Sequence, residues 1–219
     1  MKRATAAASF SVSFTVGLYG IAFGAAGTAA GFSILQTCLL SLLTFSGASQ
    51  FAVVGVLGAG GSAISGIATA SLLGIRNSLY GLRLAPLLHL RGWKKIVGAQ
   101  VTIDESTGVA LGQADLGTDA MKQGFWLTGI GVYIFWNIFT VVGALGAKAM
   151  GNPATWGLDA AVPAAFLGLV WPRLEGNLER ALAISAIALS LLLTPFVAAG
   201  VPIISTALLA VAFGWKARR

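Results

Sequence analysis

The stretch that decides the fold is ILQTCLLSLLTFSGASQFAVVGVLGAG, residues 34–60, which contains no charged side chain. Two further runs, Gly61–Pro86 and Gly124–Ala147, are almost as apolar. Each run is longer than the roughly 20 residues that a helix needs to cross the hydrocarbon of a bilayer. The sequence therefore predicts an all-α, polytopic membrane protein.

The overall composition agrees with a lipid environment. Hydrophobic residues make up 57% of the chain and charged residues only 10%, with a mean hydropathy of +0.86. A soluble domain has about 25% charged residues, so this chain lacks the side chains for an ordinary aqueous surface. Glycine is also abundant, at 29 of 219 residues, as expected where helices approach closely in lipid.

The net charge of +7 does not indicate nucleic-acid binding, because the positive side chains flank apolar runs. Such a distribution is typical of membrane proteins that face anionic headgroups. The flanking residues are Lys2, Arg3, Arg91, Lys94, Lys95, Lys216, Arg218 and Arg219. The single cysteine, Cys38, excludes an intramolecular disulfide and a Cys-rich metal site. We expect no cofactor and no metal, and we interpret the lone histidine, His89, as a solvated loop residue.

Charges and turn residues divide the chain into seven predicted spans. The apolar start shows no convincing cleavage site, so we expect the first span to be retained. The last span is interrupted near Thr194–Pro195 and Gly200–Pro202 and could be two half-helices. The spans are about 10–30, 34–58, 62–86, 96–114, 124–147, 157–172 and 180–213.

An internal similarity suggests a duplication. The segment Phe51–Ala59 matches Phe139–Ala147 at seven of nine positions, an offset of 88, and the same offset takes Gly20–Gly24 onto Gly108–Gly112. Two units of three spans would form a 3+3 inverted-topology repeat, an arrangement typical of secondary transporters. The predicted units are residues 1–88 and 89–175, followed by a C-terminal helix and basic tail at 176–219. A generic helical bundle without a repeat is the alternative.

With seven spans, the positive-inside rule favours an external N-terminus only weakly. That orientation places seven Lys and Arg residues in the inner loops, and the opposite orientation places five there.

Four motifs, in chain order, resemble those of the AzlC family of permeases. Phe45-Ser-Gly-Ala-Ser-Gln-Phe51 is similar to F-A-G-A-S-Q-F, and the segment Leu73–Pro86 to L-x-N-x-R-H-x-L-Y-G-x-S-L-A-P. Thr102-Ile-Asp-Glu105 resembles T-D-E with one residue added, and Leu158–Phe166 resembles L-D-F-A-L-P-A-x-F. The chain departs from the second motif, with Gly74 in place of Asn, Asn77 in place of His, and Arg83 in place of a small polar residue.

The resemblance implies a function and a partner. It implies export of branched-chain amino acids, and in some members methionine, across the bacterial inner membrane. It also implies a small membrane subunit of the AzlD type. The second motif adds Asn77 and Tyr80 to the candidate substrate-binding residues.

A group of small and polar residues lies in the middle of the second predicted span. Ser46, Gly47, Ser49 and Gln50 permit close packing or local unwinding, which would free backbone carbonyls for a substrate ammonium. We therefore predict substrate binding here, with Gln50 as the strongest candidate. Helix–helix packing, with the serines bonded to their own helix, is the alternative.

The charges inside spans are the other candidates. Arg76 is costly in a span unless it is paired or solvated, and its guanidinium suits a carboxylate, either that of the substrate or Asp159. Snorkelling to an interface is the alternative. Asp104, Glu105 and Asp159 are the candidates for proton coupling; the first two could instead mark a loop, and Asp159 could cap a helix.

Other functional classes fit less well. Gly47–Phe51 begins like a nucleophile elbow but has no nearby histidine, so we expect no enzymatic activity. A channel, a structural membrane subunit or a carrier of another small substrate are the alternatives. The pairs Gly20–Gly24 and Gly108–Gly112 predict packing between helices, or against a partner or second copy of the chain.

Overall fold

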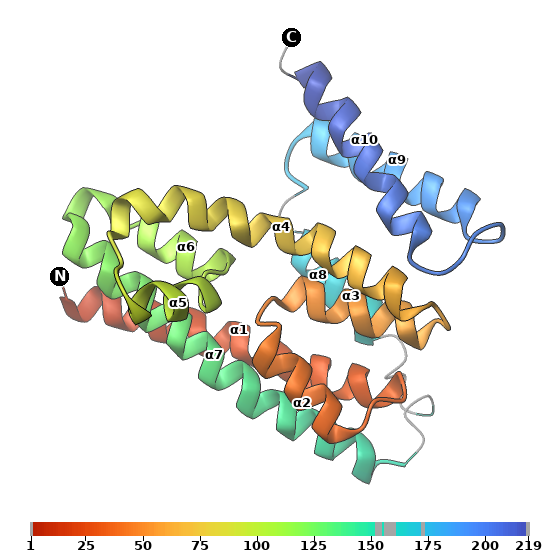
Figure 1. The fold of residues 1–219 in the computed structure, drawn as a ribbon, viewed down its shortest axis with the longest axis horizontal. Coiled ribbons are helices and arrows are strands. Elements are labelled where there is room, and N and C mark those ends of the chain that lie inside the picture. Colours follow the sequence, from red (N-terminus) through yellow and green to blue (C-terminus); the bar gives the residue numbers. More distant parts are fainter. Residues whose placement is uncertain (1, 152–154, 156–160, 172–173, 218–219) are drawn as a thin grey trace.

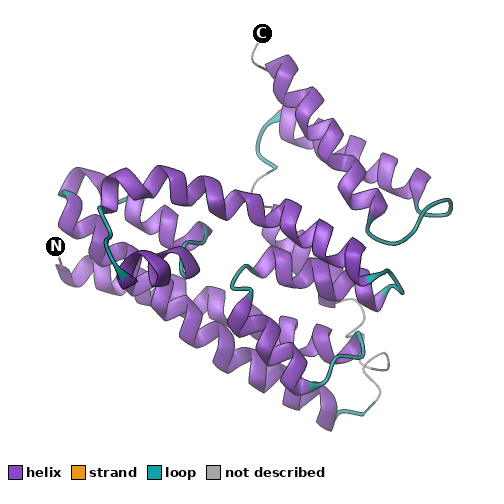
Figure 2. Ribbon diagram, in the orientation of Figure 1, coloured by secondary structure: helices purple, strands orange, loops and turns teal. Residues whose placement is uncertain are grey.

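A computed structural model describes residues 2–151, 155, 161–171 and 174–217. Within these residues the regular structure is entirely helical, without strands (Figure 2). The prediction of an all-α chain is therefore confirmed. The principal helices are α1 (Lys2–Ala29), α2 (Ile34–Leu43), α3 (Gly47–Gly58), α4 (Ala63–Leu88), α5 (Trp93–Gln100), α6 (Asp104–Leu111), α7 (Thr118–Ala149), α8 (Ala161–Val170), α9 (Asn177–Leu193) and α10 (Val201–Ala217).

Two of the described helices meet criteria of length and hydropathy for crossing a membrane. They correspond to α1 and α7, with a mean hydropathy of 1.5 over Arg3–Ala29 and 1.8 over Thr118–Ala149. α4 is nearly as long, at 26 residues, but carries Arg76 and Arg83.

α1 and α7 run side by side in the same direction and form the base of the structure (Figure 1). Their close approach depends on glycine. A Cβ on Gly20 would lie 2.5 Å from the Trp136 carbonyl oxygen, and one on Gly24 would collide with the carbonyl oxygen of Thr140. The predicted packing role of Gly20–Gly24 is thus confirmed, whereas a Cβ on Gly108 would meet nothing within 4 Å.

The second predicted span is a helical hairpin. α2 runs antiparallel to α7, because Ser41 lies beside Thr140 while Phe45 stacks edge-on against Tyr133. α3 then returns along α1, since Phe51 contacts Phe23 and Gly58 lies beside Ala30. At about 1.5 Å per residue, the 10 and 12 residues of these helices each reach roughly half of a ~30 Å hydrocarbon layer.

A second hairpin enters from the opposite end. α5 leads to a reversal at residues 101–103, where the Gln100 amide donates to the carbonyls of Leu42 and Leu43 at the end of α2. α6 then returns antiparallel to α7, with Val101 against Gly129 and Val109 against Gly124. The tips of the two hairpins therefore meet near the middle of the bundle.

The reversal at 101–103 is fixed by local hydrogen bonds. The Ser106 hydroxyl donates to the Val101 carbonyl at 2.7 Å and accepts from the Ile103 amide at 3.0 Å. The Thr102 hydroxyl donates to the Gly98 carbonyl at 2.7 Å. These bonds satisfy backbone groups that the break between α5 and α6 would otherwise leave unpaired.

The remaining helices complete the bundle. α4 runs antiparallel to α3, α8 packs on α1 and α3, and α9 and α10 pack on each other as a pair (Figure 1). The last predicted span is therefore two helices, separated at residues 194–200.

The structure does not confirm seven straight spans or an 88-residue repeat. Residues 34–58 and 96–114 each form a hairpin rather than one crossing. The matched segments Phe51–Ala59 and Phe139–Ala147 lie mainly in a 12-residue helix and in a 32-residue helix, respectively. What recurs instead is a short-helix hairpin followed by a long helix: α2–α3 then α4, and α5–α6 then α7. The two reversals, 44–46 and 101–103, are 57 residues apart.

Candidate functional site

A cavity of about 190 Å³ lies where the hairpin tips meet. Its volume is about six times the ~30 Å³ share of a water molecule, which suits a ligand nearer the size of an amino acid than of a peptide. Both tips and the middle of α1, α4 and α7 contribute to its wall. The lining residues are Val16, Tyr19, Phe45, Ser46, Gly47, Ala48, Phe51, Leu73, Arg76, Asn77, Ile103, Asp104, Glu105, Val132, Trp136 and Val170.

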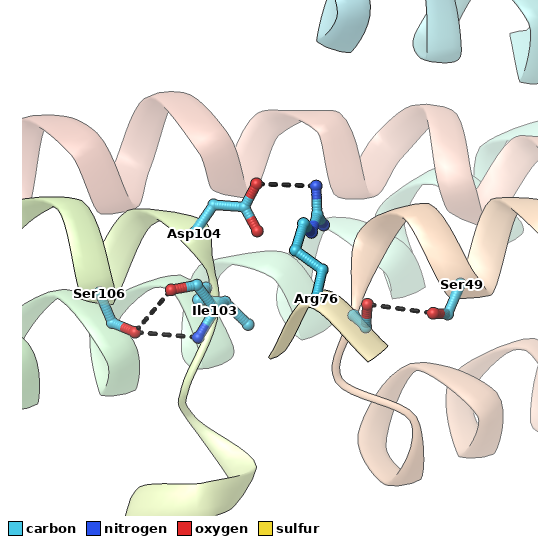
Figure 3. A network of polar contacts seen from close by, with 6 residues as sticks. Ser49, Arg76, Ile103, Asp104 and Ser106 are labelled. Carbon is cyan, nitrogen blue, oxygen red and sulfur yellow. Dashed lines mark hydrogen bonds and ion pairs between the residues drawn. The ribbon is translucent and has the colours of Figure 1, made fainter. Parts of the chain in front are cut away.

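An ion pair joins α4 to the second hairpin at this cavity. The Arg76 Nη1 atom lies 2.8 Å from Asp104 Oδ2 (Figure 3), and their side chains are 33% and 16% exposed. Asp104 is also in the first turn of α6, where the helix dipole favours a carboxylate. The pair is thus partly open to the cavity rather than sealed inside the protein.

Two buried polar atoms beside the pair have no partner among the described residues. They are Nε of Arg76, a donor, and Oδ1 of Asn77, an acceptor. Buried polar atoms are usually hydrogen-bonded, and both residues line the cavity. Both atoms are fully buried, so a bound molecule would reach this donor and this acceptor only after the side chains move.

The first turns of α3 and α6 both border the same cavity. α3 begins at Gly47 after Ser46, whose side chain makes no capping hydrogen bond to this helix. The first backbone N–H groups of a helix have no acceptor within it. Because Ser46, Gly47 and Ala48 line the cavity, this end of α3 is suited to a negatively charged ligand group.

The structure gives Gln50 a role different from the predicted one. Its side chain is fully buried and does not line the cavity. Its Nε2 donates to the carbonyls of Thr44 at 2.6 Å and Ser41 at 3.2 Å, and its Oε1 accepts from Trp136 Nε1 at 3.0 Å. Gln50 therefore holds the reversal between α2 and α3 against α7.

Ser49 is likewise a packing residue in this structure. It accepts a hydrogen bond from the Ser46 hydroxyl at 3.2 Å and donates to the Ala70 carbonyl at 2.8 Å. Ser49 is 3% exposed, and these bonds fix the start of α3 against α4. The packing alternative thus applies to Ser49, although its hydroxyl donates to α4 and not to its own helix.

The rest of the cavity wall is apolar, with both aromatic and aliphatic side chains. Phe51 and Trp136 line it and pack on Phe23 behind them, with ring centroids 5.6 Å apart for Phe23–Phe51 and 6.2 Å for Phe23–Trp136. Val132 and Ile103 are buried beside them. A ligand held by Arg76 would place any hydrocarbon side chain against this wall.

The cavity brings together six of the ten residues that the sequence singled out. They are Ser46, Gly47, Arg76, Asn77, Asp104 and Glu105. Ser49, Gln50 and Tyr80 do not line it, and Asp159 lies outside the described residues. Asp104 and Glu105 begin α6 rather than occupying a solvated loop.

Sequence reasoning missed most of the apolar wall. Trp136, Val132 and Ile103 reach the cavity only because the two hairpins reverse beside α7. Nothing in an apolar run distinguishes such residues from those facing lipid. Asn137, next to Trp136, does not line the cavity and donates to the Tyr133 carbonyl of its own helix at 2.8 Å.

Comparisons with known proteins agree on one family. A family model described as AzlC protein matches residues 11–150. The chain is similar to the inner membrane protein YgaZ of Escherichia coli (strain K12), with 30% identity over 156 residues. This alignment covers 68% of the chain but 63% of the relative, so the chain spans less than two thirds of that protein. No solved structure matches.

Proposed function

The chain belongs to the AzlC family, and from that premise we propose that it is the large subunit of a carrier that exports branched-chain amino acids. The proposal extends to other hydrophobic amino acids and to the bacterial inner membrane, which the chain would cross several times. A small AzlD-type membrane subunit is the proposed partner. One observation carries the proposal. A small, mostly apolar cavity lies between two hairpins that enter from opposite ends, and the Arg76–Asp104 ion pair lines it.

The cavity can hold both charged groups of an amino acid. Arg76 and the first turn of α3 supply donors for the carboxylate. Asn77, Asp104 and Glu105 line the same space, and their side-chain oxygens are the candidate acceptors for the ammonium. The apolar wall then receives a branched aliphatic side chain, which favours hydrophobic substrates over polar ones.

The Arg76–Asp104 pair suggests how binding and proton movement are coupled. The carboxylate of Asp104 would accept from the substrate ammonium, which a protonated carboxyl group holds far less strongly. A proton and the substrate would therefore compete for Asp104, and by linkage each would lower the affinity of the other. Proton entry would thus promote substrate exit, which is antiport.

The two hairpins are suited to act as gates. Each tip separates the cavity from one end of the bundle, and broken helices of this kind are common around transporter sites. Movement of the α2–α3 tip would open the cavity to one side, and movement of the α5–α6 tip to the other. This mechanism replaces the predicted exchange of two 88-residue halves.

The function can be tested by efflux from intact cells. Cells would be loaded with valine, leucine, isoleucine or methionine through dipeptide feeding, with this chain present alone or together with its small subunit. Faster saturable efflux of one of these amino acids supports the proposal and names the substrate. Unchanged efflux of all four, with both proteins present in the membrane, rejects this substrate class. Efflux that rises linearly with internal concentration would instead indicate a channel.

A further inference from the structure

A second cavity, of about 360 Å³, lies far from the hairpin tips, where α4 ends and α5 and α7 begin. Four of its lining residues carry basic side chains: His89, Arg91, Lys94 and Lys122. Among the described residues none of its lining side chains is acidic. Two tryptophans, Trp93 and Trp126, complete the wall with Leu88 and Leu90. Nothing in the transport mechanism uses this site.

The packing of α4 on α7 and the turn at His89 form the cavity. Leu84 and Leu88 of α4 pack in one core cluster with Met121 and Phe125 of α7, which brings the end of α4 against the start of α7. His89 then ends α4 in the left-handed conformation, with φ 51°. This sharp turn directs the chain into α5, so that Arg91 and Lys94 face Lys122 across the cavity instead of continuing along α4.

The cavity lies at the basic end of the molecule. α1 and α7 are parallel and α4 is antiparallel to them. The starts of α1 and α7 and the end of α4 therefore lie at the same end of the bundle. Within residues 2–151, six Lys or Arg residues lie at that end, and Lys148 lies at the other. The six are Lys2, Arg3, Arg91, Lys94, Lys95 and Lys122.

This asymmetry assigns the membrane orientation. Lys and Arg near span ends favour the cytoplasmic side, so the basic end faces the cytoplasm and the N-terminus is internal. The seven-span prediction weakly favoured an external N-terminus because it treats residues 34–58 and 96–114 as membrane crossings. As hairpins, they return to the side from which they entered, and the six basic residues named above then lie on one side.

The surroundings of the cavity are those of a lipid interface. Trp93 is 69% exposed and Ile96, one turn further along α5, is 75% exposed. Tryptophan is enriched at the level of lipid headgroups, and an exposed isoleucine beside it suits an acyl chain. A free anion would use the basic side chains but would leave this apolar face uncovered.

We propose that this cavity binds the phosphate headgroup of an anionic phospholipid in the cytoplasmic leaflet, with its acyl chains along Trp93 and Ile96. Arg91, Lys94 and Lys122 contact the phosphate, and Trp126 closes the inner wall. The site is distinct from the hairpin-tip cavity, and it does not depend on which substrate is carried.

The test measures lipid binding to the full chain in a neutral detergent. Fluorescent phosphatidylglycerol is titrated against the wild-type protein, with fluorescent phosphatidylcholine as the uncharged comparison. Lys94→Gln removes a lining charge, whereas Lys95→Gln removes a neighbouring charge from the same helix turn that does not line the cavity. Circular dichroism of each variant controls for folding.

The expected result is saturable binding of phosphatidylglycerol, with phosphatidylcholine weaker by at least tenfold. Lys94→Gln should weaken phosphatidylglycerol binding about fivefold, and Lys95→Gln by less than about twofold. Equal loss in the two variants would overturn the proposal, because it would show a diffuse charge effect without a site. Displacement of the lipid by millimolar inorganic phosphate would also overturn it, because the site would then be one for a soluble anion. Equal binding of the two lipids would do the same.

Discussion

Replacing Gln50 by leucine separates a structural role from a substrate-binding role. The substitution removes three hydrogen bonds, those to the carbonyls of Ser41 and Thr44 and that from Trp136. Interhelical hydrogen bonds in membrane proteins average about 0.6 kcal/mol each and reach about 1.7. Three of them give roughly 2 kcal/mol, and the buried groups left without partners add about 1 to 2. We therefore expect Gln50→Leu to lower the free energy of unfolding by about 3–4 kcal/mol.

The assay is reversible unfolding in mixed micelles, followed by tryptophan fluorescence. Gln100→Leu is the matched control, because its exposed amide also donates to hairpin carbonyls, at 3.1 and 3.4 Å, and should cost less than about 1 kcal/mol. A double-mutant cycle with Trp136→Phe should show coupling, since both residues share one bond. A Gln50→Leu protein as stable as the wild type but unable to bind substrate would refute this reasoning and restore the ligand role.

Three further predictions follow from the packing, the ion pair and the orientation. Gly24→Val should abolish folding, because any Cβ there meets the Thr140 carbonyl. Gly108→Val is the control and should retain a near-native melting temperature, because a Cβ there meets nothing within 4 Å. Equal melting temperatures for the two variants would contradict the α1–α7 contact. Asp104→Asn should reduce the stimulation of efflux by an inward proton gradient at least tenfold while retaining substrate exchange, measured in proteoliposomes; undiminished stimulation would exclude Asp104 as the coupling group. In a Cys38→Ser background, Ser62→Cys should react with an impermeant maleimide added outside intact cells and Lys95→Cys only after lysis; the reverse pattern would invert the orientation.

Much of the site could be predicted from sequence because its polar residues are anomalous in lipid. Arg76 and Asp104 are charges within apolar stretches, and such charges rarely persist without a function or a partner. Ser46 and Gly47 interrupt a run that otherwise favours a helix. Each of these residues lines the cavity. Their pairing, however, joins α4 to α6, and no sequence spacing predicts which opposite charge Arg76 meets.

The hairpins were missed because composition does not distinguish a crossing from a reversal. Residues 34–58 have the length and hydropathy of a span. The break at Thr44–Ser46 is stabilised by Gln50, just after it in the chain, and by Trp136, which lies on α7 some 90 residues further on. The same limitation produced the 88-residue repeat, since glycine- and valine-rich segments resemble one another whether a helix is short or long. Gln50 is an example of this limitation. An amide in an apolar run suggests a ligand-binding residue, and only the structure shows that it bonds the backbone carbonyls of the reversal beside it.

The central claim is that the hairpin-tip cavity binds the substrate through Arg76. Counterflow of radiolabelled leucine into proteoliposomes that contain this chain and its small subunit tests it most directly. The variants are Arg76→Ala and, as the matched control on the same helix, Arg83→Ala, whose side chain is exposed and does not line the cavity. Loss of a bidentate carboxylate contact, about 2–3 kcal/mol, predicts at least a 30-fold lower counterflow at low leucine for Arg76→Ala and near wild-type uptake for Arg83→Ala. Wild-type counterflow in both variants, with both proteins folded in the bilayer, would contradict the account.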